Sequence, residues 1–334
     1  MIRAGLTAIV FVSYVLLVPF PRLIHAQEKK TLRIVFVSLS WSAQLPFRIA
    51  NAKGFFKEQG LTVEPIFVRG GPTAIAALVS GNVDFASIGG AQAAIRSKAR
   101  GLDLNIISSL SNYTNYTLIG SKESRRLEDL RGKIIGVTGA GTFSEFTIRI
   151  YLKRNNLDPD KDVILRAIGQ TVVRAGALEK GIIAAAPFSA EDAIKLLDKG
   201  FPMIVNLNEA LRVPQSVYVT RGDMLEKYPE TTKRFLKAAI LGVQFAKHNK
   251  QEALKIGFAT GLQGEPDVIN RSYDLFSPGY AADLSVAWDG IQIMLDEDIR
   301  AGIVDKKFTL DRVINERILK QAQQELRAEG RLKP

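Results

Sequence analysis

The 334-residue sequence contains no cysteine, and it has only two histidines and two tryptophans. The absence of cysteine excludes a disulfide framework and a lipid-modified N-terminal cysteine, so a hydrophobic core must hold the fold together. The Gly-x-Ser-x-Gly and His-Glu-x-x-His motifs of common hydrolases are also absent. Glu191 and Asp192 are the one acidic pair near the ligand loops expected below, and adjacent side chains diverge on a helix. The sequence therefore predicts a binding protein with no catalytic residue, metal or cofactor.

The N-terminus is typical of an export signal. Arg3 is followed by an apolar run of 15 residues from Leu6 to Phe20, and Ala26 offers a small residue before a cut. A membrane-spanning helix needs roughly 17–25 residues, which is longer than this run. We therefore expect residues 1–26 to be a signal peptide, cleaved near Ala26, and the protein to be periplasmic. An uncleaved membrane anchor is the alternative.

Basic residues outnumber acidic residues by 45 to 34, which gives a formal net charge of +11. The basic residues are spread through the expected helices, and no stacking-aromatic motif accompanies them. We therefore expect no nucleic-acid partner. The basic balance favours anionic solutes or an anionic membrane surface.

Short β-branched segments alternate with helical patterns, which predicts an α/β fold built on doubly wound, parallel sheets. The expected strands cover residues 31–38, 61–68, 83–88, 104–110, 116–121, 133–138, 163–168, 182–187, 203–206 and 216–220. The expected helices cover residues 43–58, 73–79, 91–99, 127–130, 143–155, 171–179, 190–197, 231–248, 251–258, 265–275, 285–301 and 310–328.

Two stretches recur at a separation of 100 residues. Residues 33–38 (RIVFVS) resemble residues 133–138 (KIIGVT), and residues 77–86 resemble residues 177–186. Each pair brackets the same order of strands and helices, so we predict two similar lobes that face each other across a ligand cleft. A chance likeness between apolar strands is the alternative.

We expect the chain to cross between these lobes twice. The first lobe would comprise residues 27–117 and 218–334, and the second would comprise residues 118–217. Two crossing segments form a hinge, because few backbone angles must change for the lobes to open and close.

In an open α/β sheet, ligands bind beyond the carboxyl ends of the strands, and this rule selects six loops. The loops are 38–44, 69–73, 89–92, 138–144, 169–171 and 187–190. Most of them place Gly, Ser, Thr or Pro before a helix, whose free N–H groups and dipole favour an anion. An ordinary turn is the alternative for the loops 69–73, 89–92 and 138–144. The candidate ligand-binding residues are Ser40, Trp41, Gly71, Thr73, Gly90, Thr138, Gly139, Thr142, Pro187 and Phe188.

The sequence context of the two tryptophans predicts where each ring lies. Trp41 lies between Ser40 and Ser42, outside any apolar period, so we expect an exposed ring that contacts the ligand. Core packing is the alternative for this ring. Trp288 has apolar neighbours at helical spacing, so we expect it in the core.

Three charged residues near the loops bear on the ligand. Arg69 and Arg174 are candidates for a salt bridge to a carboxylate or sulfonate, and the alternative is that both are solvated. Glu145 lies in a first helical turn, where the dipole alone favours an acid. If it points into the cleft, a zwitterion or an amine is favoured instead.

Three motifs suggest a family. They are Ala-x-x-x-Gly-Phe-Phe-x-x-x-Gly-Leu-x-Val at residues 50–63, Ala-Ala-Leu-x-x-Gly-x-Val-Asp-Phe-Ala at 76–86, and Leu-x-Asp-Leu-x-Gly-Lys-x-x-Gly-Val at 127–137. With these motifs the chain resembles the solute-binding proteins of ABC importers for nitrate, sulfonate, taurine and bicarbonate. The resemblance implies a type II periplasmic-binding-protein fold, a ligand held between two lobes, and delivery to a permease in the cytoplasmic membrane. It also implies ligand loops at Trp41, Gly71, Thr73, Gly90, Thr138, Thr142 and Pro187.

The chain departs from that family at residues 183–188. Many members have an acidic residue in this strand and a tryptophan after it, whereas this chain reads Ile-Ala-Ala-Ala-Pro-Phe. Phe188 would replace the tryptophan, which puts the familiar substrates in doubt. Relatives that make a thiamine pyrimidine precursor rely on cysteine and histidine, and this chain has no cysteine.

We therefore expect a monomer that captures a small anionic molecule, such as a sulfonate or carboxylate, by closure of the lobes. A ligand-sensing partner of a membrane receptor is one alternative. An enzyme of the pyrimidine-precursor type is the other.

Overall fold

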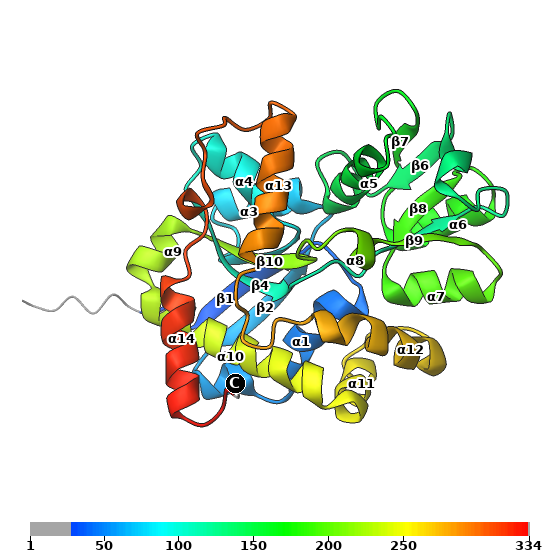
Figure 1. The fold of residues 1–334 in the computed structure, drawn as a ribbon. Helices are drawn as coiled ribbons and strands as arrows, with labels where there is room; N and C mark the ends of the chain where they lie inside the picture. The colour runs from blue at the N-terminus through cyan, green and yellow to red at the C-terminus, as the bar shows by residue number, and fades with distance from the viewer. Residues whose placement is uncertain (1–27, 333–334) are drawn as a thin grey trace, which may run out of the picture.

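The computed structural model describes residues 28–332, which form two α/β lobes (Figure 1). The expected signal peptide and its cleavage site near Ala26 lie outside these residues. The sheet of the first lobe has the strand order β2-β1-β3-β10-β4. Its strands are β1 (Thr31–Phe36), β2 (Thr62–Phe67), β3 (Phe85–Gly89), β4 (Leu104–Ser111) and β10 (Ser216–Arg221). β1 pairs in parallel with β2 and β3, and β10 runs antiparallel to β3 and β4.

The second lobe repeats this arrangement with the order β7-β6-β8-β5-β9. Its strands are β5 (Thr117–Gly120), β6 (Ile134–Val137), β7 (Ile164–Ala167), β8 (Ala185–Phe188) and β9 (Met203–Asn206). β6 pairs in parallel with β7 and β8, and β5 runs antiparallel to β8 and β9. The two sheets therefore match strand for strand, which confirms the repeat expected from the 100-residue self-similarity.

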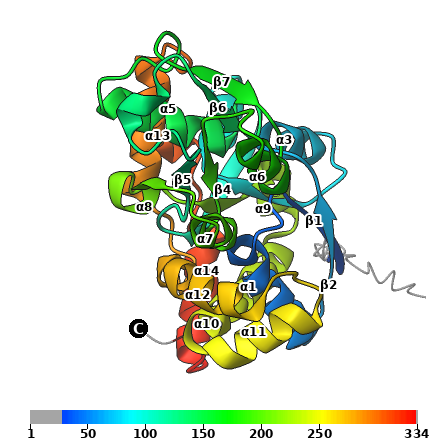
Figure 2. The same cartoon turned by 90° about the vertical axis from the view of Figure 1, so that its right-hand side faces the viewer.

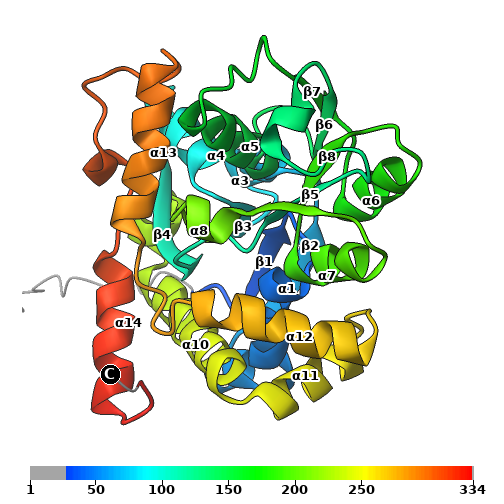
Figure 3. The same cartoon turned by 45° about the vertical axis from the view of Figure 1, so that its right-hand side comes forward.

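Helices connect and cover the strands of both sheets (Figures 1 and 3). Those between the first strands are α1 (Trp41–Ala52), α2 (Phe55–Glu58), α3 (Gly71–Val79) and α4 (Gln92–Ala99). Those of the second lobe are η1 (Leu127–Leu130), α5 (Phe143–Arg154), α6 (Thr171–Glu179), α7 (Ala190–Asp198) and α8 (Leu207–Ala210). In the described chain, none of the helices has the length and apolarity that a membrane span requires.

The chain after β10 is mostly helical and packs on the first lobe (Figure 2). Its elements are α9 (Gly222–Lys227), α10 (Pro229–His248), α11 (Lys250–Ala259), α12 (Pro266–Phe276), η2 (Ser277–Gly279), α13 (Trp288–Arg300), η3 (Leu310–Arg312) and α14 (Arg317–Ala328). α12 also lies against α7 of the second lobe, so this C-terminal part touches both sides of the interlobe space.

Three expected helices are divided or differ in their bounds by more than two residues. The expected helix over residues 43–58 is divided into α1 and α2, because Gly54 between them adopts the left-handed φ of 77°. The helix expected over 310–328 is divided into η3 and α14. The helix expected over 285–301 starts only at Trp288, and this residue is 39% exposed instead of buried, with its indole N–H 3.1 Å from Glu316 Oε2.

Two segments cross between the sheets, one before β5 and one before β10. They are joined at Gln215, whose side-chain oxygen accepts hydrogen bonds from Thr114 Oγ1 at 2.7 Å and from the Asn115 N–H at 3.1 Å. β10 returns to the first sheet at Ser216, as the sequence predicts. We propose that the lobe boundaries lie in these crossings, close to the expected positions 118 and 217.

Apolar packing continues from one lobe to the other. One cluster of buried side chains includes Ile88 and Ala94 of the first lobe together with Phe143 and Phe146 at the start of α5. The lobes are therefore in direct contact beside the hinge.

Candidate functional site

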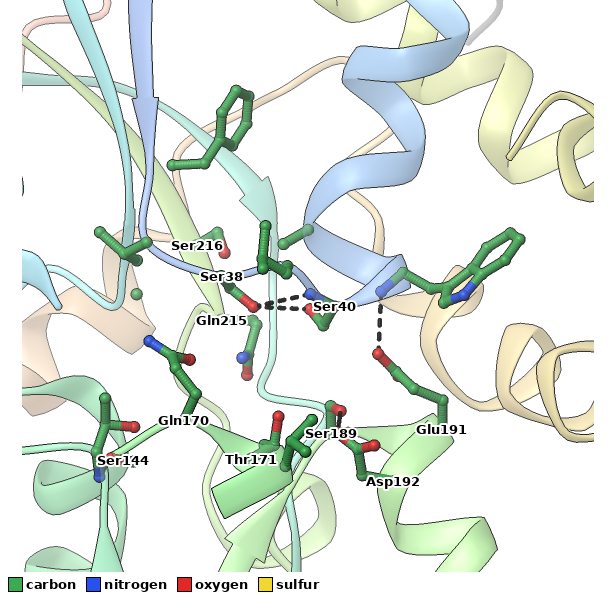
Figure 4. A pocket seen from close by; sticks show the side chains of 18 of the residues that line it. Ser38, Ser40, Ser144, Gln170, Thr171, Ser189, Glu191, Asp192, Gln215 and Ser216 are labelled. Carbon is green, nitrogen blue, oxygen red and sulfur yellow. Dashed lines mark hydrogen bonds between the residues drawn. The ribbon is translucent and has the colours of Figure 1, made fainter. Parts of the chain in front are cut away.

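A cavity of about 510 Å³ lies between the lobes, at the carboxyl ends of the parallel strands. Loops after β1, β2 and β3 supply one wall, and loops after β6, β7 and β8 supply the other. This is the position that the strand-end rule selects, and the volume suits a small molecule. Figure 4 shows Ser38 and Ser40 on one side, Ser144, Thr171 and Ser189 on the other, and the Gln215 side chain between them.

Serine hydroxyls dominate the wall at the start of α1. Ser38 Oγ lies 3.0 Å from Ser40 Oγ, which in turn lies 3.2 Å from Ser42 Oγ. Asn115 of the first crossing donates its amide to Ser42 Oγ at 2.6 Å. The hinge and this wall are therefore connected by side-chain hydrogen bonds.

The loop after β6 is largely bonded to itself. Thr142 Oγ1 donates to the Gly139 carbonyl at 2.7 Å, and the Thr138 N–H donates to Ser144 Oγ at 2.9 Å. The Gly141 N–H donates to Glu145 Oε2 at 2.6 Å. Glu145 thus caps this turn and pairs with Arg149 at 2.9 Å, and it is not among the cavity-lining residues.

Arg174 places a buried cation at the cavity. The residue belongs to α6, is 1% exposed, and lines the cavity. Its guanidinium donates to Thr138 Oγ1 at 2.8 Å, to the Gly169 carbonyl at 2.5 Å and to the Pro187 carbonyl at 2.9 Å. These three acceptors are neutral, and burial lowers the pKa of the guanidinium from its ordinary value. Its buried Nε–H has no acceptor among the described residues.

Glu191 places a buried acid at the same cavity. Glu191 is the second residue of α7 and is 6% exposed. Its Oε1 accepts a hydrogen bond from the backbone N–H of Trp41 at 3.0 Å. This bond joins the second lobe to the first (Figure 4). Burial, reinforced by the neighbouring Asp192 carboxylate, raises the pKa of Glu191 to about 7.

Two further polar side chains face the interlobe space. Burial raises the pKa of Tyr116, so its phenol stays neutral and able to donate. The Gln170 side chain at the start of α6 lines the cavity, and its amide nitrogen has no acceptor among the described residues.

The structure brings half of the candidate ligand-binding residues into the cavity lining. These are Ser40, Trp41, Gly71, Thr138 and Thr142. Thr73, Gly90, Gly139, Pro187 and Phe188 lie in or beside the same loops but outside the lining. A role in ligand binding stays a prediction for all ten.

The Trp41 ring is not exposed, contrary to our expectation. It is 2% exposed, its Nε1 donates to the Gln263 carbonyl at 2.8 Å, and its ring meets Phe258 edge-on at 4.8 Å. The indole packs between α1 and α11 because Gly257 leaves room for it: a Cβ at that position would lie 2.3 Å from Trp41 Cζ3. The backbone of Trp41, through its N–H, is the part of this residue that bonds across the cavity.

Phe143 of the second lobe lies on the end of β3. A Cβ built on Gly90 would lie 2.4 Å from Phe143 Cδ2, and Gly90 has a φ of 63°. Gly90 therefore permits a close approach of the lobes.

Among the charged candidates, Arg69 is exposed and outside the lining, whereas Arg174 is part of it. Sequence reasoning missed Gln215 at the second crossing and the 261–264 turn between α11 and α12. These residues follow helices or a coil segment, so a rule based on strand ends does not reach them.

The sequence pattern of the NMT1/THI5-like family matches residues 41–253, and the chain therefore belongs to this family. It is 24% identical over 292 residues to the putative binding protein YtlA of Bacillus subtilis, covering 84% of this chain and 86% of the relative. It is 28% identical to the taurine-binding periplasmic protein of Escherichia coli, covering 62% and 64%. It is also 28% identical to the 4-amino-5-hydroxymethyl-2-methylpyrimidine phosphate synthase THI13 of Saccharomyces cerevisiae, again covering 62% and 64%.

Solved structures confirm the periplasmic-binding-protein fold. The alkanesulfonate-binding protein SsuA of Xanthomonas axonopodis pv. citri, bound to MOPS, superposes with a TM-score of 0.72 at 16% identity, covering 86% of this chain and 99% of that one. The periplasmic nitrate-binding protein NrtA of Synechocystis superposes with a TM-score of 0.75 at 18% identity, covering 91% of both chains.

Proposed function

We propose that this protein is the solute-binding component of an ABC import system and that it binds a small anionic molecule between its lobes. The observation that carries the proposal is the buried Arg174, whose hydrogen bonds in the described chain go to neutral oxygens while it lines a 510 Å³ cavity. The Asp192 carboxylate acts on Arg174 only through space, and a buried cation without a directly bonded carboxylate is costly, so an anionic ligand would offset that cost. The relatives named for sulfonate, taurine and nitrate support an anion.

The ligand would stabilise the closed arrangement because it bonds to both walls at once. The closed protein, a monomer in the periplasm after removal of residues 1–26, would then dock on a membrane permease. The two crossings joined at Gln215 support this closure, since they leave one hinge between the lobes.

We propose binding without catalysis, although a yeast relative is named as a synthase. The absence of cysteine supports this, as does the position of His248 at the end of α10, outside the cavity lining. A role as the ligand-sensing partner of a membrane receptor would use the same closure, and a neighbouring permease gene would favour import.

The test is a thermal-shift screen of the purified protein against alkanesulfonates, carboxylates, aromatic acids and neutral heterocycles, followed by calorimetry. We expect an anion to raise the melting temperature, because a ligand at 100 times its Kd adds about 2.7 kcal/mol of stability. Arg174→Gln should abolish this response, whereas the exposed Arg166→Gln on β7 should retain it. Stabilisation by neutral compounds alone, or an unchanged response in Arg174→Gln, would refute the proposal.

A further inference from the structure

The proposed capture of an anion accounts for Arg174 and leaves Glu191 unexplained. A carboxylate in an anion-binding cavity repels the ligand, and this one is almost completely buried. Its position must therefore serve another contact.

One oxygen of Glu191 is already used and the other is free. Oε1 accepts the Trp41 N–H from the opposite lobe, and Oε2 has no hydrogen-bond partner among the described residues. The Ser189 hydroxyl and the backbone N–H of Glu191 itself lie close enough to lower the pKa of this carboxyl group, but the hydroxyl proton goes to Oδ2 of Asp192 at 3.0 Å. Lys195, one turn further along α7, lines the cavity without a hydrogen bond to Glu191 in the described chain. The buried Oε2 therefore needs a donor that the neighbouring side chains do not supply.

Arg174 and Glu191 hold different partners at the cavity. Arg174 is held beneath the loops after β6, β7 and β8, through Thr138, Gly169 and Pro187. Glu191 instead reaches the start of α1 on the other lobe. A ligand that satisfies both must carry two unlike groups.

We propose that the ligand carries, besides its anionic group, an amine or another strong N–H donor that binds Oε2 of Glu191. This deepens the proposed function and rests on it. Glu191 then sets specificity, because a ligand without the donor leaves a buried carboxylate oxygen unpaired. The same contact completes a path from the ligand through Glu191 to Trp41, so donor-bearing ligands also close the lobes better.

The experiment compares matched pairs of probes by calorimetry at pH 8, where a carboxyl of pKa about 7 is mostly ionised. The pairs are 2-aminoethanesulfonate with ethanesulfonate, 3-aminopropanoate with propanoate, and 4-aminobenzoate with benzoate. A charge-assisted hydrogen bond predicts that the amine-bearing member of at least one pair binds about tenfold to a hundredfold more tightly. Glu191→Gln keeps an acceptor for the Trp41 N–H and should abolish that preference. Asp198→Asn removes an exposed carboxylate at the other end of α7, outside the cavity lining, and should leave the preference within each pair unchanged.

Each outcome bears on one of the two proposals. Equal affinity within every pair, or a preference that survives Glu191→Gln, overturns the donor contact and leaves anion capture standing. Tighter binding of ethanesulfonate or propanoate by Glu191→Gln supports the donor contact, because the variant removes the carboxylate oxygen that these probes leave unpaired. If none of the six probes binds at millimolar concentration, the anionic-solute function itself fails.

Discussion

Closure of the lobes can be tested at Gly90, which lies outside the cavity lining. Alanine at this position would place its Cβ 2.4 Å from Phe143 Cδ2, a ring that belongs to the opposite lobe. Its φ of 63° adds a strain of about 1–2 kcal/mol that is present whether the lobes are open or closed. We expect the overlap with Phe143 to form only on closure, so it should weaken ligand binding, whereas the strain should lower stability alone.

The size of the binding effect follows from the overlap. Forcing one extra carbon into a packed contact costs about 1–3 kcal/mol, which corresponds to about a fivefold to hundredfold loss of affinity. Gly81→Ala is the matched control, because Gly81 has a φ of 75° and a Cβ there would meet no atom within 4 Å. We expect the two variants to have similar melting temperatures without ligand and different Kd values in calorimetry.

A double-mutant cycle assigns the loss to the interlobe contact. The Cβ on Gly90 would also lie 2.7 Å from Gln92 Oε1, which belongs to the same lobe. Phe143→Ala removes only the interlobe neighbour of this Cβ. In the Phe143→Ala background, adding Gly90→Ala should therefore cause little further loss of affinity. Small-angle X-ray scattering should show a larger radius of gyration for ligand-saturated Gly90→Ala than for Gly81→Ala. Equal affinity of these two variants would refute the idea that this contact forms on closure.

Stability and fluorescence test two other parts of the structure. The pKa of Glu191 is raised from 4.5 to about 7, so the folded state binds the proton more tightly than the unfolded state. The free energy of unfolding should therefore fall by about 3 kcal/mol at most as the pH rises from 4.5 to 7. The titratable groups near the Glu191 carboxyl are Asp192, Lys195, Tyr116 and Tyr280. Chemical denaturation of Glu191→Gln should show a free energy of unfolding that depends less on pH. An identical pH dependence would exclude Glu191 as the source of the change. Gly257→Ala should displace the Trp41 ring and lower the free energy of unfolding by about 1–3 kcal/mol. In a Trp288→Phe background, it should also shift the fluorescence emission of Trp41 to the red. An unchanged emission spectrum would contradict the packing described for this indole.

The sequence predicts the fold well because the signals are local. β1 and β10 keep their positions to within two residues, since alternating β-branched residues mark them, and α6 has the expected bounds of 171 and 179. The strand-end rule also selects six loops that each contribute residues to the cavity lining. The sequence does not predict contacts between residues that lie far apart in the chain and meet only after folding. Glu191 and Trp41 are 150 residues apart in sequence and meet only across the lobes.

α6 shows the limit of hydrophobic patterning most clearly. Its first turn exposes Val172 by 77% and Val173 by 56%, and it buries Arg174, the reverse of what side-chain polarity predicts. Leaving a valine in water forgoes about 1.5 kcal/mol or more of burial energy. The arrangement persists because Arg174 finds three backbone or hydroxyl acceptors on loops that no pattern in the helix can indicate. Exposed apolar residues beside a buried charged residue are expected at functional sites, where ligand binding is favoured at a cost in stability. Val172 and Arg174 both line the cavity, so the inversion agrees with the ligand site that we propose at this end of α6.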